Sequence, residues 1–455
     1  MSRVHFIGIG GIGMSALAEI ALARGSKVSG SDLHSSPLVA RLQGLGAEVR
    51  VGEHRAENEG EASRVVVSDA VRPDNPELAL ARERGIPVLR RSQYLAELMS
   101  GHRGLAVSGT HGKTTTTAMI ATILVEAGMD PTVALGGEYA PLGGNARIGK
   151  GEWMVVEACE AFNSHLDLAP EIAVVTNIEA EHLDYHKTEA ALRGSFAAFL
   201  GRIKPGGSAI LCFDWEAVRE IAGSFRGRKV SYGLSQGCDY RATEVSWGQK
   251  GGRFVLLHKE KPQGSFELRL FGEHEVANAT GAIAAAAEAG VELDAARSAL
   301  AEFTGVGRRF QTVGAARGIS VVDDYAHHPT EIEATLLAAR AQFPKRRLVA
   351  VFQPHLYSRT QAFVEEFARA LSRADVMIVT EVYAAREAPI PGVSGEAIVE
   401  AARSLGKEDA QFLAPKEAIG EKLLPKLRPG DVLLTLGAGD VYTVARDILA
   451  RLRGR

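Results

Sequence analysis

Short apolar runs that end in glycine-rich or polar turns recur along this chain, and helical patterns follow most of these turns. The first two runs are residues 3–7 and 27–30, and an Ala/Leu-rich helix is predicted between them over residues 14–23. Strands that alternate with helices in this way are typical of parallel α/β layers, in which ligands bind where the strands end. The pattern therefore predicts an α/β protein.

The same pattern starts again twice further along the chain. The predicted strands of the second and third segments are residues 104–107, 153–156, 172–175, 319–322, 348–352, 376–379 and 432–436. A helix follows the first of them up to about residue 127, and an amphipathic helix runs to residue 453. Because 455 residues exceed what one hydrophobic core organises, we expect three domains, over residues 1–98, 99–310 and 311–455.

Composition narrows the class of protein. Hydrophobic residues make up 46% and charged residues 24%, and the formal net charge is −3, which implies neither a nucleic acid nor an anionic membrane as partner. Glycines and Glu19 break the early apolar stretch of residues 4–23, which fits neither a signal peptide nor a spanning helix. Cys159, Cys212 and Cys238 lack the density of a disulfide framework. We expect a cytoplasmic protein, either a monomer or a homodimer.

The first glycine cluster is Gly8-Ile9-Gly10-Gly11-Ile12-Gly13, between the first strand and its helix. Such a turn lets the backbone approach a pyrophosphate at a helix N-terminus, and Asp32 lies at the distance expected for a contact with a ribose hydroxyl. A dinucleotide-dependent oxidoreductase, another nucleoside diphosphate and a purely structural turn all remain open at this point.

The second glycine-rich cluster is a more specific signal than the first. Gly109-Thr110-His111-Gly112-Lys113-Thr114 stands between an apolar strand and a helix, where backbone N–H groups and Lys113 can hold β/γ-phosphates and Thr114 can meet Mg²⁺. The spacing is shorter than in the common phosphate loop, since Val107 occupies the place of its first glycine. The motif favours ATP or GTP binding over a simple helix cap.

Carboxylates and histidines follow the next strands of the second segment. Glu157 ends one strand, and the run Thr176-Asn177-Ile178-Glu179-Ala180-Glu181-His182 follows another. We expect Glu157 and His182 near the Mg²⁺ of a nucleotide, where they neutralise phosphate charge. Glu160 either shares this site or is a solvated carboxylate.

Two polar clusters follow strands of the third segment. They are Asp323-Asp324-Tyr325-Ala326-His327-His328-Pro329-Thr330-Glu331 and Phe352-Gln353-Pro354-His355-Leu356-Tyr357-Ser358-Arg359-Thr360. We expect the strand that ends at Phe352 to lie beside the strand that leads to Tyr325, so that both clusters share one sheet edge and bind a polar substrate. Asn278 and Arg309, at junctions between segments, either contact a nucleotide or are structural.

Taken in order, these motifs resemble the Mur ligase family across essentially the whole chain. The resemblance implies a Rossmann-like N-terminal domain that binds a UDP-sugar, a central P-loop ATPase-like domain and a Rossmann-like C-terminal domain that brings the amino acid. The implied reaction is ATP-dependent amide formation between L-alanine and the lactoyl carboxylate of UDP-N-acetylmuramate. The implied cofactors are ATP and Mg²⁺, with Mn²⁺ as a substitute.

The resemblance also implies residue roles. The residues implied as catalytic are Lys113, Glu157, His182, His327 and Arg359. Those implied to bind ATP are Gly109, Thr110, His111, Gly112, Lys113, Thr114, Thr115, His274, Asn278, Arg309 and Asp324. The UDP-sugar is assigned to Gly10, Gly11, Ile12, Gly13, Met14, Ser15, Asp32 and Ser68, the amino acid to Tyr325, His327 and Arg359, and the metal to Thr114, Glu157 and His182.

The sequence departs from the family pattern at a few positions. Glu275 stands where an Asn is usual, Leu356 where some members have a second arginine, and Ala161-Phe162-Asn163 where acidic and serine residues are usual. Arg193 is the nearest counterpart of a carbamylated lysine in later enzymes of the pathway. Three rivals stay open: an oxidoreductase, which leaves Gly109 to Thr114 unused, a non-catalytic nucleotide-binding regulator, and a family member that attaches a whole tripeptide.

Overall fold

The computed structural model describes residues 2–181, 183–385 and 387–454 of the chain. These residues form two compact units, which are described separately. The first comprises the chain up to Glu244 with Phe254–Glu267 and Val276–Phe303, and the second comprises Val245–Arg253, Leu268–Glu275 and the chain from Thr304 onward. Among the described residues, no helix has the length and apolarity that crossing a membrane requires.

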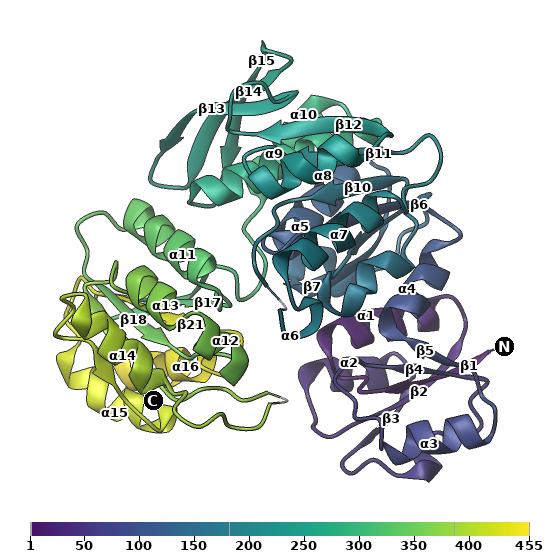
Figure 1. Cartoon of the computed structure of the whole chain (residues 1–455), viewed down its shortest axis with the longest axis horizontal. Coiled ribbons are helices and arrows are strands. Elements are labelled where there is room, and N and C mark those ends of the chain that lie inside the picture. Colours follow the sequence, from purple (N-terminus) through teal and green to yellow (C-terminus); the bar gives the residue numbers. More distant parts are fainter. Residues whose placement is uncertain (1, 182, 386, 455) are drawn as a thin grey trace. The chain divides into compact units, whose positions relative to one another are not determined.

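The N-terminal part of the first unit is a five-stranded parallel sheet in the order β3-β2-β1-β4-β5 (Figure 1). Its elements are β1 (Arg3–Ile7), α1 (Ile12–Ala23), β2 (Lys27–Asp32), α2 (Pro37–Gly44), β3 (Glu48–Val51), β4 (Arg64–Val67), α3 (Pro76–Glu83), β5 (Val88–Arg90) and α4 (Arg91–Met99). The chain leaves β1 toward β2 on one side and later returns to β4 on the other. The edge beyond β1 and β4 is therefore a topological switch point, where such sheets bind ligands.

Helix α1 is buried from Met14 to Ala21. It packs against its own sheet and also against β7 and β8 of the neighbouring sheet, so that one apolar core continues through both. A helix with apolar neighbours on all sides needs an apolar sequence all round, which explains why α1 carries Ala, Leu and Ile on every face.

The central sheet of ten strands has the order β15-β14-β13-β12-β11-β10-β6-β9-β7-β8. Its strands are β6 (Arg103–Ser108), β7 (Thr132–Tyr139), β8 (Gly144–Arg147), β9 (Trp153–Glu157), β10 (Ile172–Val175), β11 (Ser208–Cys212), β12 (Arg228–Gly233), β13 (Tyr240–Trp247), β14 (Gly252–His258) and β15 (Lys261–Leu268). The helices of this region are α5 (Lys113–Glu126), α6 (Leu183–His186), α7 (Glu189–Leu200), α8 (Glu216–Ser224), α9 (Glu273–Glu288) and α10 (Leu293–Glu302).

Strand β6 lies between β9 and β10, parallel to both. Val107 pairs with Glu157 and Val175 pairs with Ser108, so the polar residues that follow these three strands meet at one edge. This convergence was predicted from the sequence.

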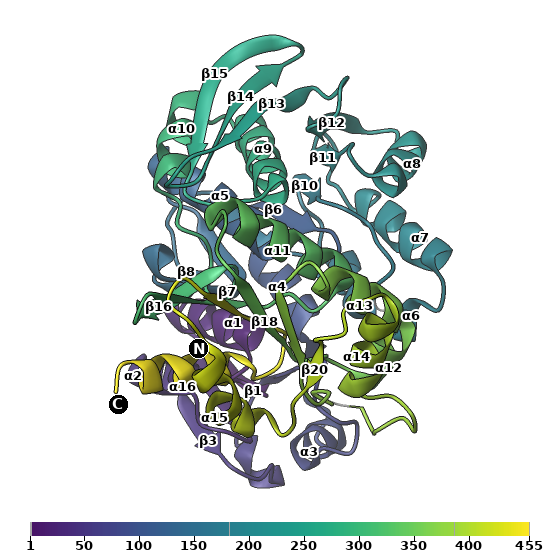
Figure 2. The same cartoon turned by 90° about the vertical axis from the view of Figure 1, so that its left-hand side faces the viewer.

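The second unit is built on a six-stranded sheet in the order β16-β17-β21-β18-β19-β20. Its elements are β16 (Gln311–Ala316), β17 (Ile319–Asp324), α11 (Pro329–Gln342), β18 (Leu348–Phe352), α12 (Tyr357–Ala362), α13 (Val364–Leu371), β19 (Val376–Val379), α14 (Gly395–Ser404), β20 (Gln411–Phe412), α15 (Ile419–Leu423), β21 (Val432–Leu436) and α16 (Tyr442–Leu452). Helices α11, α13 and α14 cover one face, and α15 and α16 cover the other (Figure 2).

One expectation about this sheet is wrong. The strand that ends at Phe352 does not lie beside the strand that leads to Tyr325, because β21, the last strand of the chain, is inserted between them. Asp324 and Phe352 both pair with Leu436, so the two polar clusters still emerge at the same edge of the sheet. The expected strands are present, and several of them run one or two residues further into the polar turns.

A buried polar network around Glu77 of α3 joins this helix to β1 and β2 of the N-terminal sheet. The Glu77 carboxylate accepts a hydrogen bond of 2.7 Å from Ser31 Oγ. It also lies 2.7 Å from His5 Nε2 and 2.6 Å from His54 Nδ1. The side chains of His5 and Glu77 are fully buried. Burial acts to raise the pKa of Glu77, but the hydrogen bonds from His5, Ser31 and His54 outweigh it and hold the pKa below its usual value.

We predict that Glu77→Gln lowers the free energy of unfolding by about 2–4 kcal/mol at pH 7, because it leaves buried partners of the carboxylate unsatisfied. A carboxyl group with a lowered pKa contributes stability above the unfolded pKa of 4.5, and this contribution is lost as pH falls. The difference in the free energy of unfolding between the wild type and Glu77→Gln, measured by urea denaturation, should therefore become smaller below about pH 4.5. Glu48→Gln, which removes an exposed partner of Arg3, serves as control and should change little. An equal loss in both variants would contradict the prediction.

Candidate functional site

The loop between β6 and α5 is held by the end of strand β10. A Cβ atom at Gly109, which has φ +136°, would lie 2.0 Å from Thr176 Oγ1, so no other residue fits here. Thr176 Oγ1 donates to His111 O at 2.6 Å, and the Asn177 side chain accepts from His111 N at 2.7 Å and donates to His111 O at 3.0 Å. Thr176 and Asn177 thus act as a clamp on the loop.

Lys113 opens helix α5, directly after Gly112 in the left-handed conformation. Its Nζ donates to the carbonyls of Gly109 and Thr110 at 2.5 and 2.9 Å, and it lies 3.0 Å from the carboxylate of Glu160. Burial lowers the pKa of Lys113, but the carboxylate of Glu160 and its neighbours outweigh this and raise it above the ordinary value. The side chain is therefore a partly buried ammonium at the N-terminus of a helix, an arrangement that suits phosphate.

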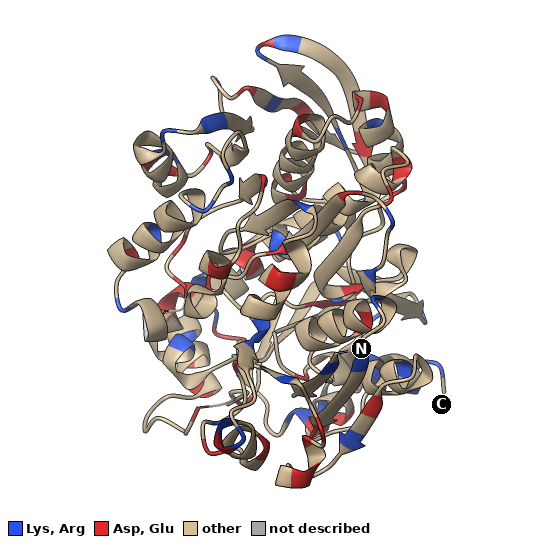
Figure 3. Cartoon of the chain, turned by 90° about the vertical axis from the view of Figure 1, so that its right-hand side faces the viewer, with Lys and Arg blue, Asp and Glu red and all other residues tan. Residues whose placement is uncertain are grey.

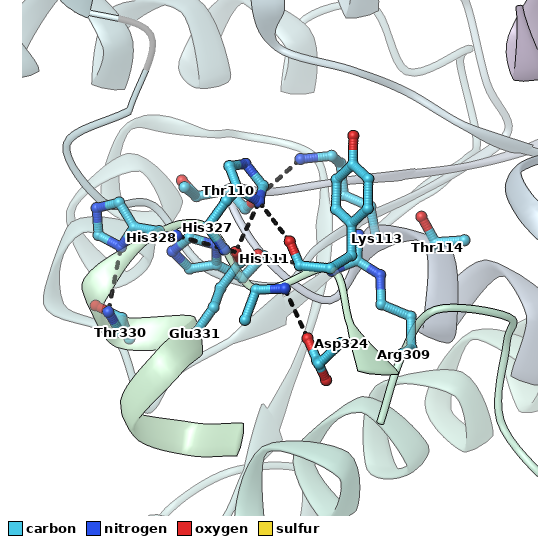
Figure 4. Close-up of polar contacts among 12 residues, drawn as sticks. Thr110, His111, Lys113, Thr114, Arg309, Asp324, His327, His328, Thr330 and Glu331 are labelled. Carbon is cyan, nitrogen blue, oxygen red and sulfur yellow. Dashed lines mark hydrogen bonds and ion pairs between the residues drawn. The ribbon is translucent and has the colours of Figure 1, made fainter. Parts of the chain in front are cut away.

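Thr114 and Glu157 form a second contact beside the loop (Lys113 and Thr114 are drawn in Figure 4). Thr114 Oγ1 donates to Glu157 Oε2 at 2.7 Å, and Gly136 N donates to the same oxygen at 3.2 Å. A hydroxyl and a carboxylate next to a phosphate site are oxygen ligands of the kind that Mg²⁺ prefers. These two residues could hold the metal, whereas His182, which was assigned with them, lies outside the described residues.

Other residues assigned to ATP contact this loop or lie apart from it. Asn278, buried in α9, borders the loop, because a Cβ atom at Gly112 would lie 2.5 Å from its Oδ1. Thr110 Oγ1 accepts from Glu179 N at 2.9 Å, and Thr115 is buried in α5. His274 is an exposed side chain at the start of α9.

Arg193, the counterpart of the carbamylated lysine, does not point toward the loop. Its guanidinium pairs with Glu220 at 2.6 Å and with Glu189 at 3.3 Å on the outer side of α7. A second metal ligand is therefore not supplied from this position.

The first glycine turn is closed by Asp32, at the end of β2. Asp32 Oδ2 accepts from Gly10 N at 2.9 Å, and Gly10 has no room for a Cβ atom, which would lie 2.9 Å from the same oxygen. Ser68, after β4, packs against Gly8 on the other side of β1. Gly10, Asp32 and Ser68 therefore meet at the switch point of the sheet.

Two further residues border this turn that sequence reasoning missed. Asn145, at the start of β8, donates to Ile12 O at 2.5 Å and to Ser15 Oγ at 2.9 Å. Arg91, the first residue of α4, lies beside Gly13, where an added Cβ would be 3.4 Å from its Nη1. An arginine directly after a strand could have indicated an anion site, but nothing in the sequence shows that Asn145 reaches a turn 130 residues away.

In the second unit, Asp324 organises the segment that enters the sheet. It accepts from Phe310 N and from Ala326 N, both at 2.7 Å. Figure 4 shows the Asp324 side chain. Burial raises the pKa of Asp324 to about 7, although Arg309 and the two backbone N–H groups act in the opposite direction. Both carboxylate oxygens are bound to the backbone, so Asp324 shapes the loop that carries Arg309.

The residues assigned to the amino acid lie in one row at the edge of this sheet. Tyr325 and His327 have ring centroids 5.3 Å apart, His327 and His355 6.1 Å, and His355 and Tyr383 5.6 Å. Arg359, in the middle of α12 and buried, donates to His355 O at 3.3 Å. The structure thus groups Tyr325, His327 and Arg359 and adds His355 and Tyr383 to them.

Charges of both signs are interspersed along the described chain in the view of Figure 3. Against this mixed background, the cations Lys113 and Arg91 are placed at glycine turns that follow strands. The first unit therefore carries a glycine-rich loop with Lys113, a second glycine turn beside Arg91 and the contact between Thr114 and Glu157, and the second unit carries an aromatic row with a guanidinium.

Comparisons with known proteins match almost the whole chain to models of one family. Residues 3–103 match the model "Mur ligase family, catalytic domain", residues 107–286 match "Mur ligase middle domain" and residues 308–439 match "Mur ligase, glutamate ligase domain". Two curated relatives are UDP-N-acetylmuramate–L-alanine ligases. That of Geobacter sp. strain M21 is 48% identical and that of Anaeromyxobacter sp. strain Fw109-5 is 47% identical, over at least 99% of this chain and 98% of each relative.

Two solved structures show the same fold. The UDP-N-acetylmuramate-alanine ligase of Thermotoga maritima is 31% identical, with a TM-score of 0.86 and complete coverage of both chains. A murein peptide ligase of Psychrobacter arcticus is 24% identical, with a TM-score of 0.74 and 99% coverage of both chains.

We predict that Gly136→Ala lowers the affinity for Mn²⁺ in the presence of a nucleotide by at least about tenfold, as expected when a metal ligand is displaced. The added Cβ would lie 2.3 Å from Glu157 Oε2 and would push the carboxylate away from Thr114. Mn²⁺ titration by electron paramagnetic resonance measures this. Gly223→Ala, with no atom within 4 Å of the added Cβ, is the matched control. Normal affinity in Gly136→Ala would argue against Glu157 as a metal ligand.

Proposed function

The chain belongs to the Mur ligase family, and we propose that its three polar edges serve the ATP-dependent joining of L-alanine to UDP-N-acetylmuramate. The reaction forms an amide at the lactoyl carboxylate through an acyl phosphate and gives UDP-N-acetylmuramoyl-L-alanine, ADP and phosphate for peptidoglycan precursor synthesis. We choose this reaction because the chain is 47–48% identical, along its full length, to ligases of L-alanine. We assign the UDP-sugar to residues 1–98, ATP to residues 99–310 and the amino acid to residues 311–455.

The first step activates a carboxylate, which is a poor electrophile. The lactoyl carboxylate oxygen attacks the γ-phosphorus of ATP, the bond to the β/γ-bridging oxygen breaks, and ADP leaves with its electron pair. The amine of alanine, once it has lost a proton, then attacks the acyl carbon and expels phosphate. No enzyme nucleophile is required, so the protein contributes positioning and charge neutralisation.

Lys113 and the loop around it supply much of this neutralisation for ATP. The Lys113 ammonium stands at the N-terminus of α5, and the loop that carries it is fixed by Thr176 and Asn177. Negative charge grows on the β/γ-bridging oxygen in the transition state, and a positioned ammonium stabilises it there. Asn278, next to Gly112, is assigned to the same nucleotide.

Mg²⁺ fits Thr114 and Glu157, because a hydroxyl and a carboxylate lie 2.7 Å apart beside the phosphate loop. When bound, the metal neutralises phosphate charge and orients the transferred group. We assign His182 to the same metal from the family resemblance. Glu157 has no role as a base in this scheme, since the phosphorylated group is already a carboxylate.

The UDP part of the sugar nucleotide is assigned to the first glycine turn. Residues Ile12 to Met14, in the first turn of α1, present backbone N–H groups at the N-terminus of the helix, and Arg91 adds a cation beside Gly13. A pyrophosphate suits such a site. Because Asp32 closes the turn through Gly10 N, its contact with ligand would use the second carboxylate oxygen.

L-alanine is assigned to the aromatic row of the second unit, with Arg359 as the anchor for its carboxylate. A guanidinium binds a carboxylate in two parallel hydrogen bonds, which a single ammonium does not. Tyr325 and His327 border the amine in this assignment. We place the reaction in the cytoplasm, where ATP is supplied.

Phosphate release from ATP should require UDP-N-acetylmuramate and L-alanine together. The motivation is the presence of a triphosphate loop, a diphosphate turn and an amino-acid edge in one chain. A coupled phosphate assay with each substrate omitted in turn provides the test. Equal release without the sugar nucleotide, or with UDP-N-acetylglucosamine in its place, would refute the proposed function.

Arg359→Ala should raise the KM for L-alanine by at least about thirtyfold, on the scale of a charge-assisted hydrogen-bonded pair, and leave the KM for UDP-N-acetylmuramate nearly unchanged. Steady-state kinetics with both substrates in one variant measure the two values. Arg369→Ala, which removes an exposed partner of Glu365 one helix later, is the control and should change neither. An equal rise in both KM values would place the amino-acid site elsewhere.

A further inference from the structure

Glu160 is a buried carboxylate that the assigned roles leave unused. It is 1% exposed, and its two oxygens lie 3.0 and 3.2 Å from Lys113 Nζ. Taking such a pair out of water is costly, and a carboxylate does not bind the phosphates that Lys113 is assigned to. A negative charge beside a site for ATP also repels the triphosphate. This position therefore calls for a role in the reaction other than binding the nucleotide.

The backbone that carries Glu160 is strained. Phe162 and Asn163 are consecutive non-glycine residues with φ of 55° and 56°. This conformation is costly for such residues and persists only where the surroundings enforce it. We call residues 160–164 the Glu160 turn.

Contacts from α6 and α7 hold the Glu160 turn in place. Ser195 Oγ donates to Asn163 Oδ1 at 2.5 Å, and the same hydroxyl lies 3.0 Å from His165 Nε2. His186 Nε2 lies 3.2 Å from the carbonyl oxygen of Glu160, and the Phe162 ring packs edge-on against Tyr185. Ser195 and His165 are buried, so α6 and α7 fix a strained turn that contacts the phosphate loop through Glu160.

We propose that Glu160 is a positioning residue, which fixes the place of the Lys113 ammonium, and that Ser195 supports it by holding the Glu160 turn. The inference rests on the proposed function of Lys113 in phosphoryl transfer. Among the described residues, the ammonium contacts the carbonyls of Gly109 and Thr110 and the carboxylate of Glu160, and of these three contacts the carboxylate is the one from outside its own loop. Loss of this anchor leaves the charge but frees its position.

This role predicts opposite effects on binding and on turnover. Glu160→Gln removes a negative charge that repels ATP, so ground-state binding of ATP should stay the same or become tighter. The ammonium is then less well placed for the charge that develops in the transition state, so kcat falls. A purely structural role would lower the active fraction without separating the two effects.

The experiment compares the full-length wild type with Glu160→Gln, Glu160→Asp and Ser195→Ala. Calorimetry with Mg·ATP gives Kd, and phosphate release at saturating substrates gives kcat. In Glu160→Gln, kcat should fall by at least about tenfold, while Kd stays within about threefold or falls. Glu160→Asp should recover part of the loss, and Ser195→Ala should lower kcat by about threefold with Kd unchanged. Glu59→Gln, in a buried carboxylate paired with Arg84 in the N-terminal sheet region, is the matched control and should keep its kcat.

Near-normal kcat in Glu160→Gln would overturn the proposal, and so would a loss matched by weaker ATP binding or shared by Glu59→Gln. If Glu160→Gln does not fold, Ser195→Ala decides, because a normal kcat in that variant removes the support assigned to the turn. Failure of the proposed function is seen separately, as phosphate release by the wild type that does not depend on the UDP-sugar.

Discussion

A carboxylate at the end of a parallel strand, bound to a backbone N–H of a neighbouring turn or strand, holds each of the three polar edges. Asp32 ends β2 and binds Gly10 N, Glu157 ends β9 and binds Gly136 N, and Asp324 ends β17 and binds Phe310 N and Ala326 N. Parallel strands of one sheet end at the same level, so these carboxylates fall where the turns are. The turns are shaped by the fold before any ligand binds.

These carboxylates lie at edges that are assigned to phosphates and to a carboxylate substrate, which raises a problem of like charges. Backbone N–H groups and cations balance them. Lys113 offsets Glu160, and Arg309 lies near Asp324, whose pKa burial raises to about 7. Asp324 therefore favours its neutral form over more of the pH range than an exposed aspartate does, which lowers the repulsion at that edge.

Much of the fold followed from the sequence because parallel strands are buried and read as apolar runs that stop at polar residues. The strand that leads to the loop of Lys113, the strands that end at Glu157 and Asp324, and the convergence of the polar residues after β6, β9 and β10 were predicted in this way. Strand order was not, because periodicity carries no information on which strands are neighbours. The insertion of β21 between β17 and β18 pairs residues that are 112 positions apart on one side, such as Ser320 and Val432, and 84 apart on the other, such as Leu348 and Val432, and no local pattern indicates it.

Asn145 and Arg91 were missed for the same physical reason as the strand order. Motifs find side chains that lie near a turn in sequence, whereas Asn145 reaches Ile12 and Ser15 from β8, and Arg91 reaches Gly13 from α4, only through tertiary packing. The hairpin of β7 and β8 also carries Gly136, which binds Glu157, so one element touches both the contact between Thr114 and Glu157 and the first glycine turn. A transfer between ATP and a sugar nucleotide requires the two sites to keep a fixed separation, since a shift of about 1 Å weakens such a reaction strongly. Within the first unit, a short hairpin that contacts both sites meets this requirement better than two independent turns would.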